Sequence, residues 1–308
     1  MPVCSHRRRA EPRRDALKLG SRGVWFFTDR LAAPAAAAFA RRVEELGYAA
    51  LWLPEALGRD PFAHCAWLLA HTERLILATG IANIYARDAN AMSAAQRTLA
   101  EQSGGRFLLG LGVSHAPMVE GLRGHSYGKP VATMRDYLTR MDAAPYGAVE
   151  AEAAPPRVIA ALGPRMLELA RESCTGAHPY LVPPEHTARA REILGPDAWL
   201  CTEQKVLLER DPSRARTAAR QAAALYLGLP NYRNNLKRLG YTDDDCNGGG
   251  SDRLIDALVA WGDEKALEAR VQAHLDAGAS HVCVQPLDPE GRPVPDERVL
   301  AALAPEAP

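Results

Sequence analysis

Short apolar segments alternate with amphipathic segments along most of the chain. The apolar segments predict eight strands, at residues 23–27, 50–55, 75–85, 106–113, 157–162, 176–182, 199–209 and 281–287. The amphipathic segments have apolar residues at helical spacing and predict helices at residues 34–47, 60–72, 90–105, 130–141, 164–174, 183–195, 211–228 and 265–278. The first of these helices begins at Pro34 and ends at Gly47, the residue types typical of those positions.

This alternation predicts the fold class. Strands that are apolar throughout are typical of a parallel sheet covered on both faces. Eight strand–helix units favour a closed (β/α)8 barrel, the TIM barrel, over an open doubly wound sheet. A barrel of this kind needs about 250 residues, so the sequence predicts one barrel domain at residues 17–308.

Two connections are longer than the others. Residues 142–156 are rich in Ala, Glu and Pro and predict a surface link. Residues 229–264 contain PNYRNNLKRLGY, TDDDCNGGGSD and a short predicted helix, DRLIDALVAWG. Long insertions after barrel strands commonly cover the active-site mouth, so we expect residues 229–264 to cap the carboxyl-terminal face. The three aspartates suggest either a metal site or a solvated turn, and the absence of calcium-loop spacing favours the turn.

Charge and composition exclude some classes of partner. The 37 basic and 37 acidic residues balance, so no overall basic field attracts nucleic acid or an anionic membrane. No apolar run reaches the roughly 18 residues that span a bilayer. Residues 1–16 are arginine-rich and lack an apolar stretch behind them; they predict a disordered tail, with a nucleic-acid or targeting arm as the alternative.

The cysteines predict reduced thiols and a cytoplasmic protein. They form no CxxC pair and have neither zinc-site nor disulfide-scaffold spacing: Cys4, Cys65, Cys174, Cys201, Cys246 and Cys283. Buried free cysteines pack as small apolar side chains and persist in reducing compartments.

The fourth predicted strand leads into RFLLGLGVSHAPMVEG, residues 106–121. It fails the G-x-G-x-x-G fingerprint, because His115 stands at the third glycine position. It also fails the G-x-S-x-G elbow, because Ala116 stands at the final glycine. Pro117 is expected to stop any regular element. The strand therefore delivers Ser114 and His115 to the end of the barrel where chemistry is found, either as reactive groups or as structural ones.

A second candidate motif is ALGPRMLELA, residues 161–170. A buried strand passes through Gly163 directly into a helix. The N–H groups of Arg165 and Met166, together with the helix dipole, favour a bound anion. The next strand, in TGAHPYLVPPEH, adds a glycine, Gly176, and His178.

The chain has no HExxH, Walker, paired-carboxylate or cysteine-cluster motif. We therefore expect no metal, and an organic cofactor to carry the chemistry. Aromatic and methionine side chains either line an apolar pocket or pack in the core and cap: Trp25, Phe26, Met118, Tyr180, Tyr226 and Tyr232.

Several segments together resemble the bacterial luciferase-like monooxygenase superfamily. They are VEELGYAALWLPE, ATGIANIYARD, RFLLGLGVSHAPMVEGLRGHSYGKPVATMRDYL, ALGPRMLELA, GAHPYLVPPEHTARAREILGP, LPNYRNNLKRLGY and LVAWGDEKALEARVQAHLDAGASHVCVQPL. They resemble in particular the actinobacterial-type oxidoreductases that use the deazaflavin coenzyme F420, whereas related barrels bind FMN.

This resemblance implies a set of site residues. A bulge in the third strand, with a non-proline cis peptide at Gly80–Ile81, would support the cofactor ring. Asn83 and Ser114 match further cofactor contacts at strand ends. Glu55 matches an acidic position at the ring edge, where it would orient the ring or a histidine. The cofactor-binding set that the resemblance implies for the phosphate and its surroundings is Gly163, Pro164, Met166, Gly176 and His178.

His115 matches a strand-end position on the substrate side of the ring. Its ordinary pKa of about 6.5 suits a general acid or base near neutrality. Relatives often carry a histidine directly after the acidic residue of the second strand, and here that residue is Ala56. His115 or His178 would then take over proton transfer, or the chemistry differs.

The resemblance thus implies an F420-dependent oxidoreductase that moves a hydride between the deazaflavin and a small organic substrate. The alternatives are an FMN-dependent monooxygenase and a non-catalytic cofactor-binding barrel. The superfamily often dimerises through barrel helices, which makes a homodimer an expectation.

Overall fold

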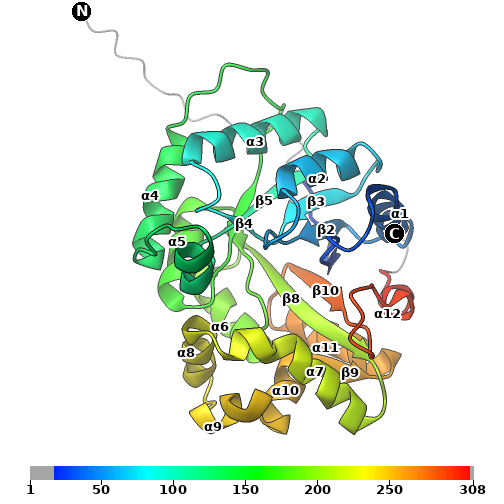
Figure 1. The fold of residues 1–308 in the computed structure, drawn as a ribbon. Coiled ribbons are helices and arrows are strands. Elements are labelled where there is room, and N and C mark those ends of the chain that lie inside the picture. The colour runs from blue at the N-terminus through cyan, green and yellow to red at the C-terminus, as the bar shows by residue number, and fades with distance from the viewer. Residues whose placement is uncertain (1–16, 306–308) are drawn as a thin grey trace, which may run out of the picture.

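The computed structural model describes residues 17–305 and shows a closed parallel barrel (Figure 1). Its eight barrel strands are β1 (Arg22–Trp25), β2 (Ala50–Leu53), β3 (Ile76–Thr79), β5 (Phe107–Gly112), β6 (Arg157–Ile159), β7 (Gly176–Ala177), β8 (Trp199–Leu208) and β10 (His281–Pro286). Each strand pairs in parallel with the next, and β10 pairs with both β8 and β1, which closes the ring. The predicted (β/α)8 fold is confirmed. The predicted tail, residues 1–16, lies outside the described residues.

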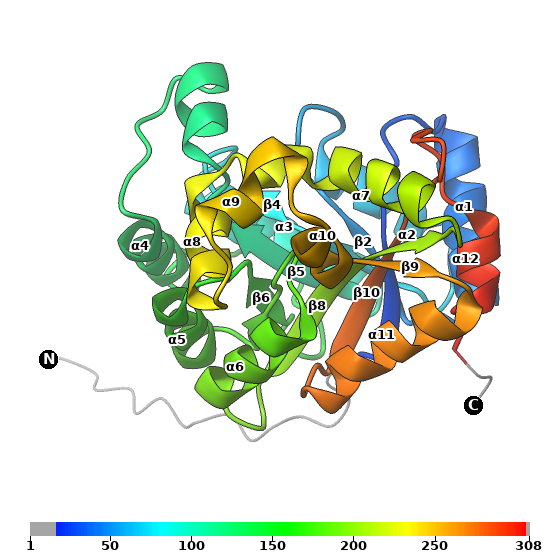
Figure 2. The ribbon, with the colours of Figure 1, turned by 90° about the horizontal axis from the view of Figure 1, so that it is seen from below.

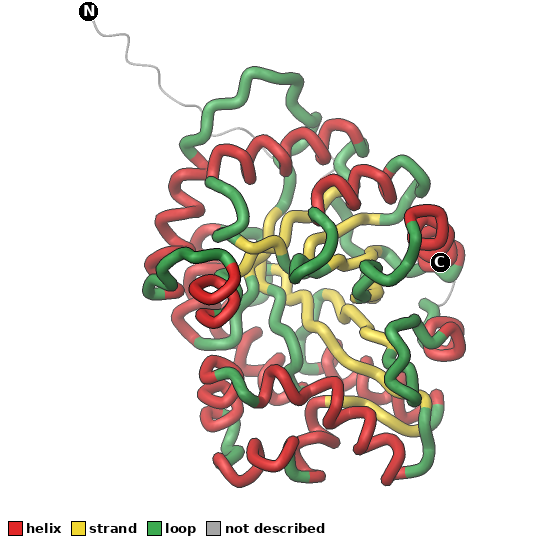
Figure 3. Tube along the Cα trace, in the orientation of Figure 1, coloured by secondary structure: helices red, strands yellow, loops and turns green. Residues whose placement is uncertain are grey.

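Helices surround the strands, as Figure 3 shows. The barrel helices are α1 (Ala33–Glu45), α2 (Pro61–Leu69), α3 (Ala89–Gln102), α4 (Pro130–Asp142), α5 (Pro164–Ser173), α6 (Pro184–Leu194), α11 (Glu264–Asp276) and α12 (Glu297–Ala302). Aspartates cap several of them; Asp60 accepts hydrogen bonds from the amides of Phe62 and Ala63 at the start of α2. No helix among the described residues is long and apolar enough to cross a membrane.

Side chains alternate between the inside and the outside of the barrel along each strand. On β8, Leu200 and Val206 belong to the layer between strands and helices. Cys201, between them in the opposite phase, belongs to the interior cluster with Trp25 and Trp52. Residues 203 and 205 share the phase of Cys201, so they point into the barrel.

The third strand is interrupted where a continuous strand, 75–85, was predicted. It ends at Thr79 and resumes as β4 (Ala82–Asn83), which pairs with the end of β5. The peptide bond between Gly80 and Ile81 is cis, as the family resemblance implied. A Cβ on Gly110 would lie 2.0 Å from the Thr79 carbonyl oxygen. The glycines of the GLG motif therefore make room for this bulge.

A long excursion separates β8 from α11. It comprises α7 (Pro212–Leu227), α8 (Pro230–Arg238), α9 (Asp243–Cys246), the 3-10 helix η2 (Asn247–Gly249), α10 (Asp252–Leu258) and β9 (Val259–Gly262). We call residues 212–262 the cap segment. Most of its buried apolar residues form one cluster with Leu181, which follows β7. Leu162 and Leu287, which follow β6 and β10, pack against this cluster. The segment thus packs on the carboxyl-terminal ends of the strands (Figure 2).

Two local predictions for this region differ from the structure. Helix α7, predicted as an ordinary barrel helix, packs with α8, α10 and β9, and α11 instead covers β8 and β10. Residues 259–262, predicted as helix, form β9, which pairs with β8 from Lys205 to Leu208. Val259 and Trp261 favour a strand, but a four-residue segment is too short for its period to be read.

Candidate functional site

The bulge at Thr79–Ile81 is held on two sides. From inside the barrel, Trp25 Nε1 donates a hydrogen bond to the Gly80 carbonyl oxygen at 2.9 Å. From β5, the Thr79 hydroxyl donates to the Gly110 carbonyl oxygen at 2.7 Å and accepts from the Gly110 amide at 2.9 Å. A Cβ on Gly80 would lie only 2.6 Å from Trp25 Nε1. The bulge is therefore a fixed platform at the carboxyl end of β3.

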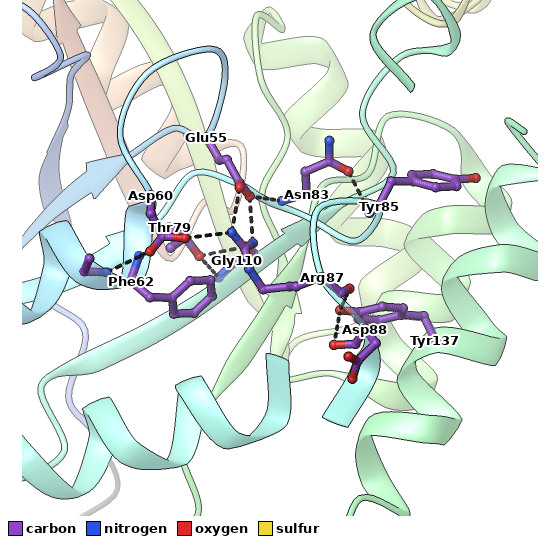
Figure 4. A network of polar contacts seen from close by, with 11 residues as sticks. Glu55, Asp60, Phe62, Thr79, Asn83, Tyr85, Arg87, Asp88, Gly110 and Tyr137 are labelled. Atoms are coloured by element: carbon purple, nitrogen blue, oxygen red, sulfur yellow. Dashed lines mark hydrogen bonds and ion pairs between the residues drawn. The ribbon is translucent and has the colours of Figure 1, made fainter. Parts of the chain in front are cut away.

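Glu55 braces this platform (Figure 4). Arg87 binds its two carboxylate oxygens at 2.7 and 2.9 Å, and the Asn83 amide donates to one of them at 2.7 Å. The Glu55 side chain is 7% exposed. Both oxygens are thus engaged, and the structure places Glu55 against an arginine rather than against a histidine.

Asn83 is buried and also serves the local fold. Its side-chain oxygen accepts from the Tyr85 amide at 2.9 Å, so that oxygen closes a turn after β4. The Tyr85 hydroxyl in turn accepts from the Gly128 amide at 3.2 Å, which connects this turn to the loop that follows β5.

Ser114 and His115 leave β5 in an unusual conformation. Ser114 has φ of 55°, in the left-handed region, and its carbonyl oxygen accepts from the Tyr127 hydroxyl at 3.2 Å. The expectation that Pro117 ends regular structure is wrong. A π-helix, η1 (Pro117–Leu122), begins at it, because proline is tolerated in a first helical turn.

His115 is half-buried, and burial lowers the pKa of its imidazole below the ordinary 6.5. Its ring lies 6.0 Å from that of Tyr232 in α8. The side chain is therefore neutral at pH 7, beside the cap segment at the mouth of the barrel.

The start of α5 has features that favour an anion. Gly163 caps the helix, Pro164 occupies its first turn, and Arg165 is exposed. A Cβ on Gly163 would lie 3.6 Å from the Arg238 guanidinium, so a cation from α8 faces the glycine. The expectation of a free Met166 amide at this site is wrong. The amide of Met166 donates to the Gly163 carbonyl oxygen at 3.1 Å, and its side chain is buried in the core.

Gly176 and His178 do not join this anion site. Gly176 pairs with Val158 inside β6, whereas Gly163 lies beyond the end of that strand, at the start of α5. A Cβ on Gly176 would collide with the Trp199 backbone, so this glycine serves strand pairing. His178 lies inside the barrel, stacked on Trp52 at 4.5 Å, and is 1% exposed.

The barrel interior holds a buried polar network that the sequence pattern did not predict. Lys205 Nζ donates to Glu203 Oε1 at 3.2 Å, to Gln285 Oε1 at 2.9 Å and to the Tyr180 hydroxyl at 2.7 Å. The Tyr226 hydroxyl donates to that of Tyr180 at 3.2 Å. Two charged residues at alternate positions of an apolar strand were the available signal, since such residues point to the same side.

Burial shifts the protonation of this network. It raises the pKa of the Glu203 carboxyl and lowers that of the Lys205 amine, and their mutual attraction opposes both shifts. Burial also raises the pKa of the Tyr180 hydroxyl well above its ordinary value. The pair carries no net charge in either its ionised or its neutral form.

Aromatic rings follow one another around the mouth. The ring centroids of Phe27 and Trp25 are 4.9 Å apart, and those of Trp25 and Tyr180 are 5.0 Å apart. Tyr180 contacts Tyr226 at 5.1 Å. We call Phe27, Trp25, Tyr180 and Tyr226 the aromatic arc. Phe26 does not belong to it, because it packs outward on Phe39 at 5.4 Å.

Two other regions hold charges without forming this site. A cavity of about 740 Å³ lies beside the end of β8 and is lined mainly by residues 288–298; its acids Asp288 and Asp296 are paired with Arg292 and Arg298. In the cap segment, Asp243 pairs with Lys237. The lining of that cavity shares no residue with the bulge, the start of α5 or the aromatic arc.

The aspartate triplet has a structural role. Thr242 and Asp245 form a capping box at the start of α9, and Asp245 binds Arg253 at 2.6 Å. Among residues 17–305 the cysteines are unpaired: Cys65, Cys174, Cys201, Cys246 and Cys283.

Comparison with known proteins gives consistent matches. The model of the luciferase-like monooxygenase family matches residues 21–281. A putative coenzyme F420-dependent oxidoreductase of Mycobacterium tuberculosis is 28% identical over 247 residues, covering 65% of this chain and 71% of the relative. The 5,10-methylenetetrahydromethanopterin reductase of Methanolobus tindarius is 25% identical over 292 residues, covering 79% of this chain and 87% of the relative.

Solved structures agree on the fold. The coenzyme F420-dependent tetrahydromethanopterin reductase of Methanopyrus kandleri matches with a TM-score of 0.73 at 17% identity, covering 93% of this chain and 98% of that one. At this identity the match concerns the fold.

Proposed function

Because this chain belongs to the luciferase-like monooxygenase family, we propose that it is an oxidoreductase that binds coenzyme F420 at the carboxyl-terminal end of its barrel. The observation that carries the proposal is a rigid bulge and an anion site at the same end of one barrel. The bulge closes β3 at Gly80–Ile81, and the anion site follows β6 at Gly163. A relative 28% identical, named for F420 dependence, supports the choice of cofactor.

The residues present suit a flat ring with a phosphate-bearing tail. The bulge is held by Trp25 and braced by Glu55, so it offers a fixed surface for one face of a ring. The space beside Gly163, with the Arg238 guanidinium near it, would hold a phosphate, because helix amino termini and arginine both favour anions.

The deazaflavin, when bound, accepts or donates a hydride. The chain supplies position and protons. His115, neutral at pH 7 because burial lowers its pKa, is a candidate acid or base on the substrate side of the ring, and its other possible role is to shape the pocket. Glu55 has no free carboxylate oxygen for such a step, because Arg87 and the Asn83 amide occupy both. Glu55 therefore acts by holding the bulge.

A binding titration tests the proposal. Purified protein is titrated with oxidised F420 and separately with FMN, and the fluorescence and absorbance of each cofactor are followed. We expect saturable binding of F420 that is at least ten times tighter than that of FMN, a difference of about 1.4 kcal/mol. Tight FMN binding without F420 binding would contradict the proposal and favour a flavin-dependent monooxygenase on the same barrel.

A further inference from the structure

We propose that Tyr226 exchanges a proton with the oxygen of the substrate, and that Tyr180 and Lys205 carry this proton into the barrel interior. The substrate that fits this arrangement is a neutral alcohol, or its carbonyl counterpart, with an apolar body. The inference rests on the proposed function, because F420 would supply the hydride acceptor for such a substrate.

A continuous hydrogen-bonded path joins Glu203, Lys205, Tyr180 and Tyr226. Glu203 Oε1 accepts from Lys205 Nζ at 3.2 Å, and Lys205 Nζ lies 2.7 Å from the Tyr180 hydroxyl. The Tyr180 and Tyr226 hydroxyls are 3.2 Å apart. The path thus leads from a fully buried carboxylate in β8 to a hydroxyl carried by the cap segment.

Tyr226 is the member with capacity for a ligand. The Tyr180 hydroxyl already has three partners, namely Lys205, Gln285 and Tyr226. The Tyr226 hydroxyl has one among the described residues, and a hydroxyl can donate one hydrogen bond and accept two. A substrate oxygen would therefore meet Tyr226 rather than Tyr180.

The path has two arrangements that differ only in hydroxyl rotation. In the structure, Tyr226 donates to Tyr180, and Tyr180 donates to Gln285 Oε1 at 3.0 Å. With a substrate oxygen present, Lys205 donates to Tyr180, Tyr180 to Tyr226, and Tyr226 to the substrate. Hydrogen bonds aligned in one direction strengthen one another, so the second arrangement stabilises negative charge on the substrate oxygen.

The surroundings determine the substrate class. Glu203 and Lys205 compensate each other, so the path attracts neither anions nor cations. In the aromatic arc, Trp25 lies beside Tyr180 and Phe27 lies beside Trp25, and Phe27 is 36% exposed. An apolar body would pack on these rings while its single oxygen reaches Tyr226.

The proposed step balances. In the oxidising direction, the C–H bond of the alcohol carbon breaks, and its hydrogen leaves with both electrons to the deazaflavin. The O–H bond also breaks, and the C=O bond forms. The hydroxyl proton passes to Tyr226, the proton of Tyr226 to Tyr180, and that of Tyr180 to the neutral amine of Lys205, which becomes ammonium. The reducing direction reverses each transfer.

Other groups face Lys205 and influence its protonation. Glu203 on the same strand, Tyr180 after β7 and Tyr226 on α7 lie close to the Lys205 amine. Cys283 on β10 and Tyr232 on α8 interact with the Glu203 carboxylate. Because burial lowers the pKa of Lys205, its neutral form is easier to reach than that of an exposed lysine. The oxidation rate should therefore rise with pH as Lys205 loses its proton.

The first test compares two tyrosines of the cap segment. The protein is loaded with F420 and assayed by cofactor absorbance with a panel of linear and cyclic secondary alcohols and ketones. Tyr226→Phe should lower kcat by about 100-fold or more, the usual contribution of proton transfer, with little change in KM or F420 affinity. Tyr241→Phe, the same change at a tyrosine whose hydroxyl forms no hydrogen bond within residues 17–305, should keep wild-type kcat.

The second test removes the charges without unpairing either one. The double variant Glu203→Gln with Lys205→Met keeps side-chain volume. Proteins usually tolerate the replacement of a whole buried ion pair by uncharged residues of similar size. The double variant should lose the alkaline rise of the oxidation rate, whereas a merely structural network would leave the pH profile in place. A denaturation midpoint for each variant shows whether the chain has folded.

A third readout needs neither turnover nor cofactor. 4-Nitrophenol is titrated with the protein, and its absorbance reports the ionisation of its oxygen. The wild type and Tyr241→Phe should increase the phenolate fraction at a given pH, and Tyr226→Phe should not. Equal spectra for folded wild type and Tyr226→Phe would overturn the inference, as would unchanged kcat in Tyr226→Phe.

The outcomes separate the two proposals. A wild type that fails to bind F420 overturns the proposed function. A wild type that binds F420 but converts no alcohol or ketone of the panel overturns this inference and leaves the proposed function standing.

Discussion

Glu55 and Arg87 form a bidentate ion pair that joins the end of β2 to the turn after β4, with N–O distances of 2.7 and 2.9 Å. The two side chains are 7% and 15% exposed. The pair therefore fixes the segment that follows the bulge, and its loss should affect both stability and cofactor binding.

Replacement of Arg87 by Met should lower the free energy of unfolding by about 3–5 kcal/mol, because it leaves a buried carboxylate unpaired. Urea denaturation measures the change. Arg135→Met is the matched control, since Arg135 and its partner Glu172 are 53% and 47% exposed; it should cost less than about 1 kcal/mol. Equal effects at both positions would contradict a bracing role for Arg87.

Gly110→Ala should destabilise the barrel by about 3 kcal/mol, at the upper end for overpacked sites. The new Cβ would lie 2.0 Å from a backbone oxygen that cannot rotate away. Gly147→Ala serves as the control, because a Cβ there meets nothing within 4 Å. Thermal melts of both variants check the difference, and a Gly110→Ala melting temperature equal to that of Gly147→Ala would refute it.

Buried histidines should make the protein acid-sensitive. Burial lowers the pKa of His178 and His281 to about 4 and that of His274 to about 3. Below pH 6.5 the unfolded chain binds protons that the folded chain does not. Stability is therefore full above pH 6.5 and decreases toward pH 4, by about 1.4 kcal/mol per pH unit for each such histidine.

Urea denaturation between pH 7 and 5 measures this slope. His274→Gln should reduce the slope by one histidine's share, whereas His125→Gln, at an exposed position, should leave it unchanged. A slope that is the same in wild type and His274→Gln would show that His274 does not contribute.

Arg238→Ala should weaken F420 binding about tenfold, the worth of a charge-assisted contact to phosphate. The loss should shrink at high salt, because screening weakens the wild-type contact as well. Arg140→Ala, on the exposed face of α4, is the control. If Arg238→Ala binds F420 as the wild type does at both salt concentrations, the phosphate lies elsewhere.

His115→Gln should lower kcat by about 100-fold if the imidazole transfers a proton, with F420 affinity retained. Because burial lowers the His115 pKa below 6.5, the activity that depends on neutral His115 should persist below pH 6.5 and fall at lower pH. Steady-state kinetics across pH 4.5–8 test both points. A kcat for His115→Gln close to wild type would assign His115 to shaping the pocket.

The barrel was predictable from the sequence because each strand and helix leaves a pattern within its own segment of the chain. Each strand carries its own apolar run, and the strand–helix alternation specifies the architecture. Parts of the site depend on contacts distant in sequence. Glu55 and Arg87 are 32 residues apart, and no pattern within either segment shows that they meet.

The cap segment illustrates a second limit. Helix α7 follows a barrel strand and is amphipathic, so its sequence resembles that of a barrel helix, yet it packs with α8 and α10. Lys205 illustrates a third case, in which a signal existed. Charged residues at positions 203 and 205 of a buried strand required partners inside the barrel. These partners are Tyr180, which follows β7, and Gln285 of β10, and Tyr226 of α7 extends the network through Tyr180.

Strand β9 has a consequence for how this protein can diversify. The cap segment leaves the barrel after Leu208 and returns at Gly262, and these two residues are paired in adjacent strands, about 4.8 Å apart in the sheet. Its two ends thus lie at one point of the wall. The intervening chain can be lengthened, shortened or exchanged as a cassette without shifting the register of any barrel strand. The residues that the cap segment presents to the barrel mouth can therefore change while the bulge at Gly80–Ile81 stays in place.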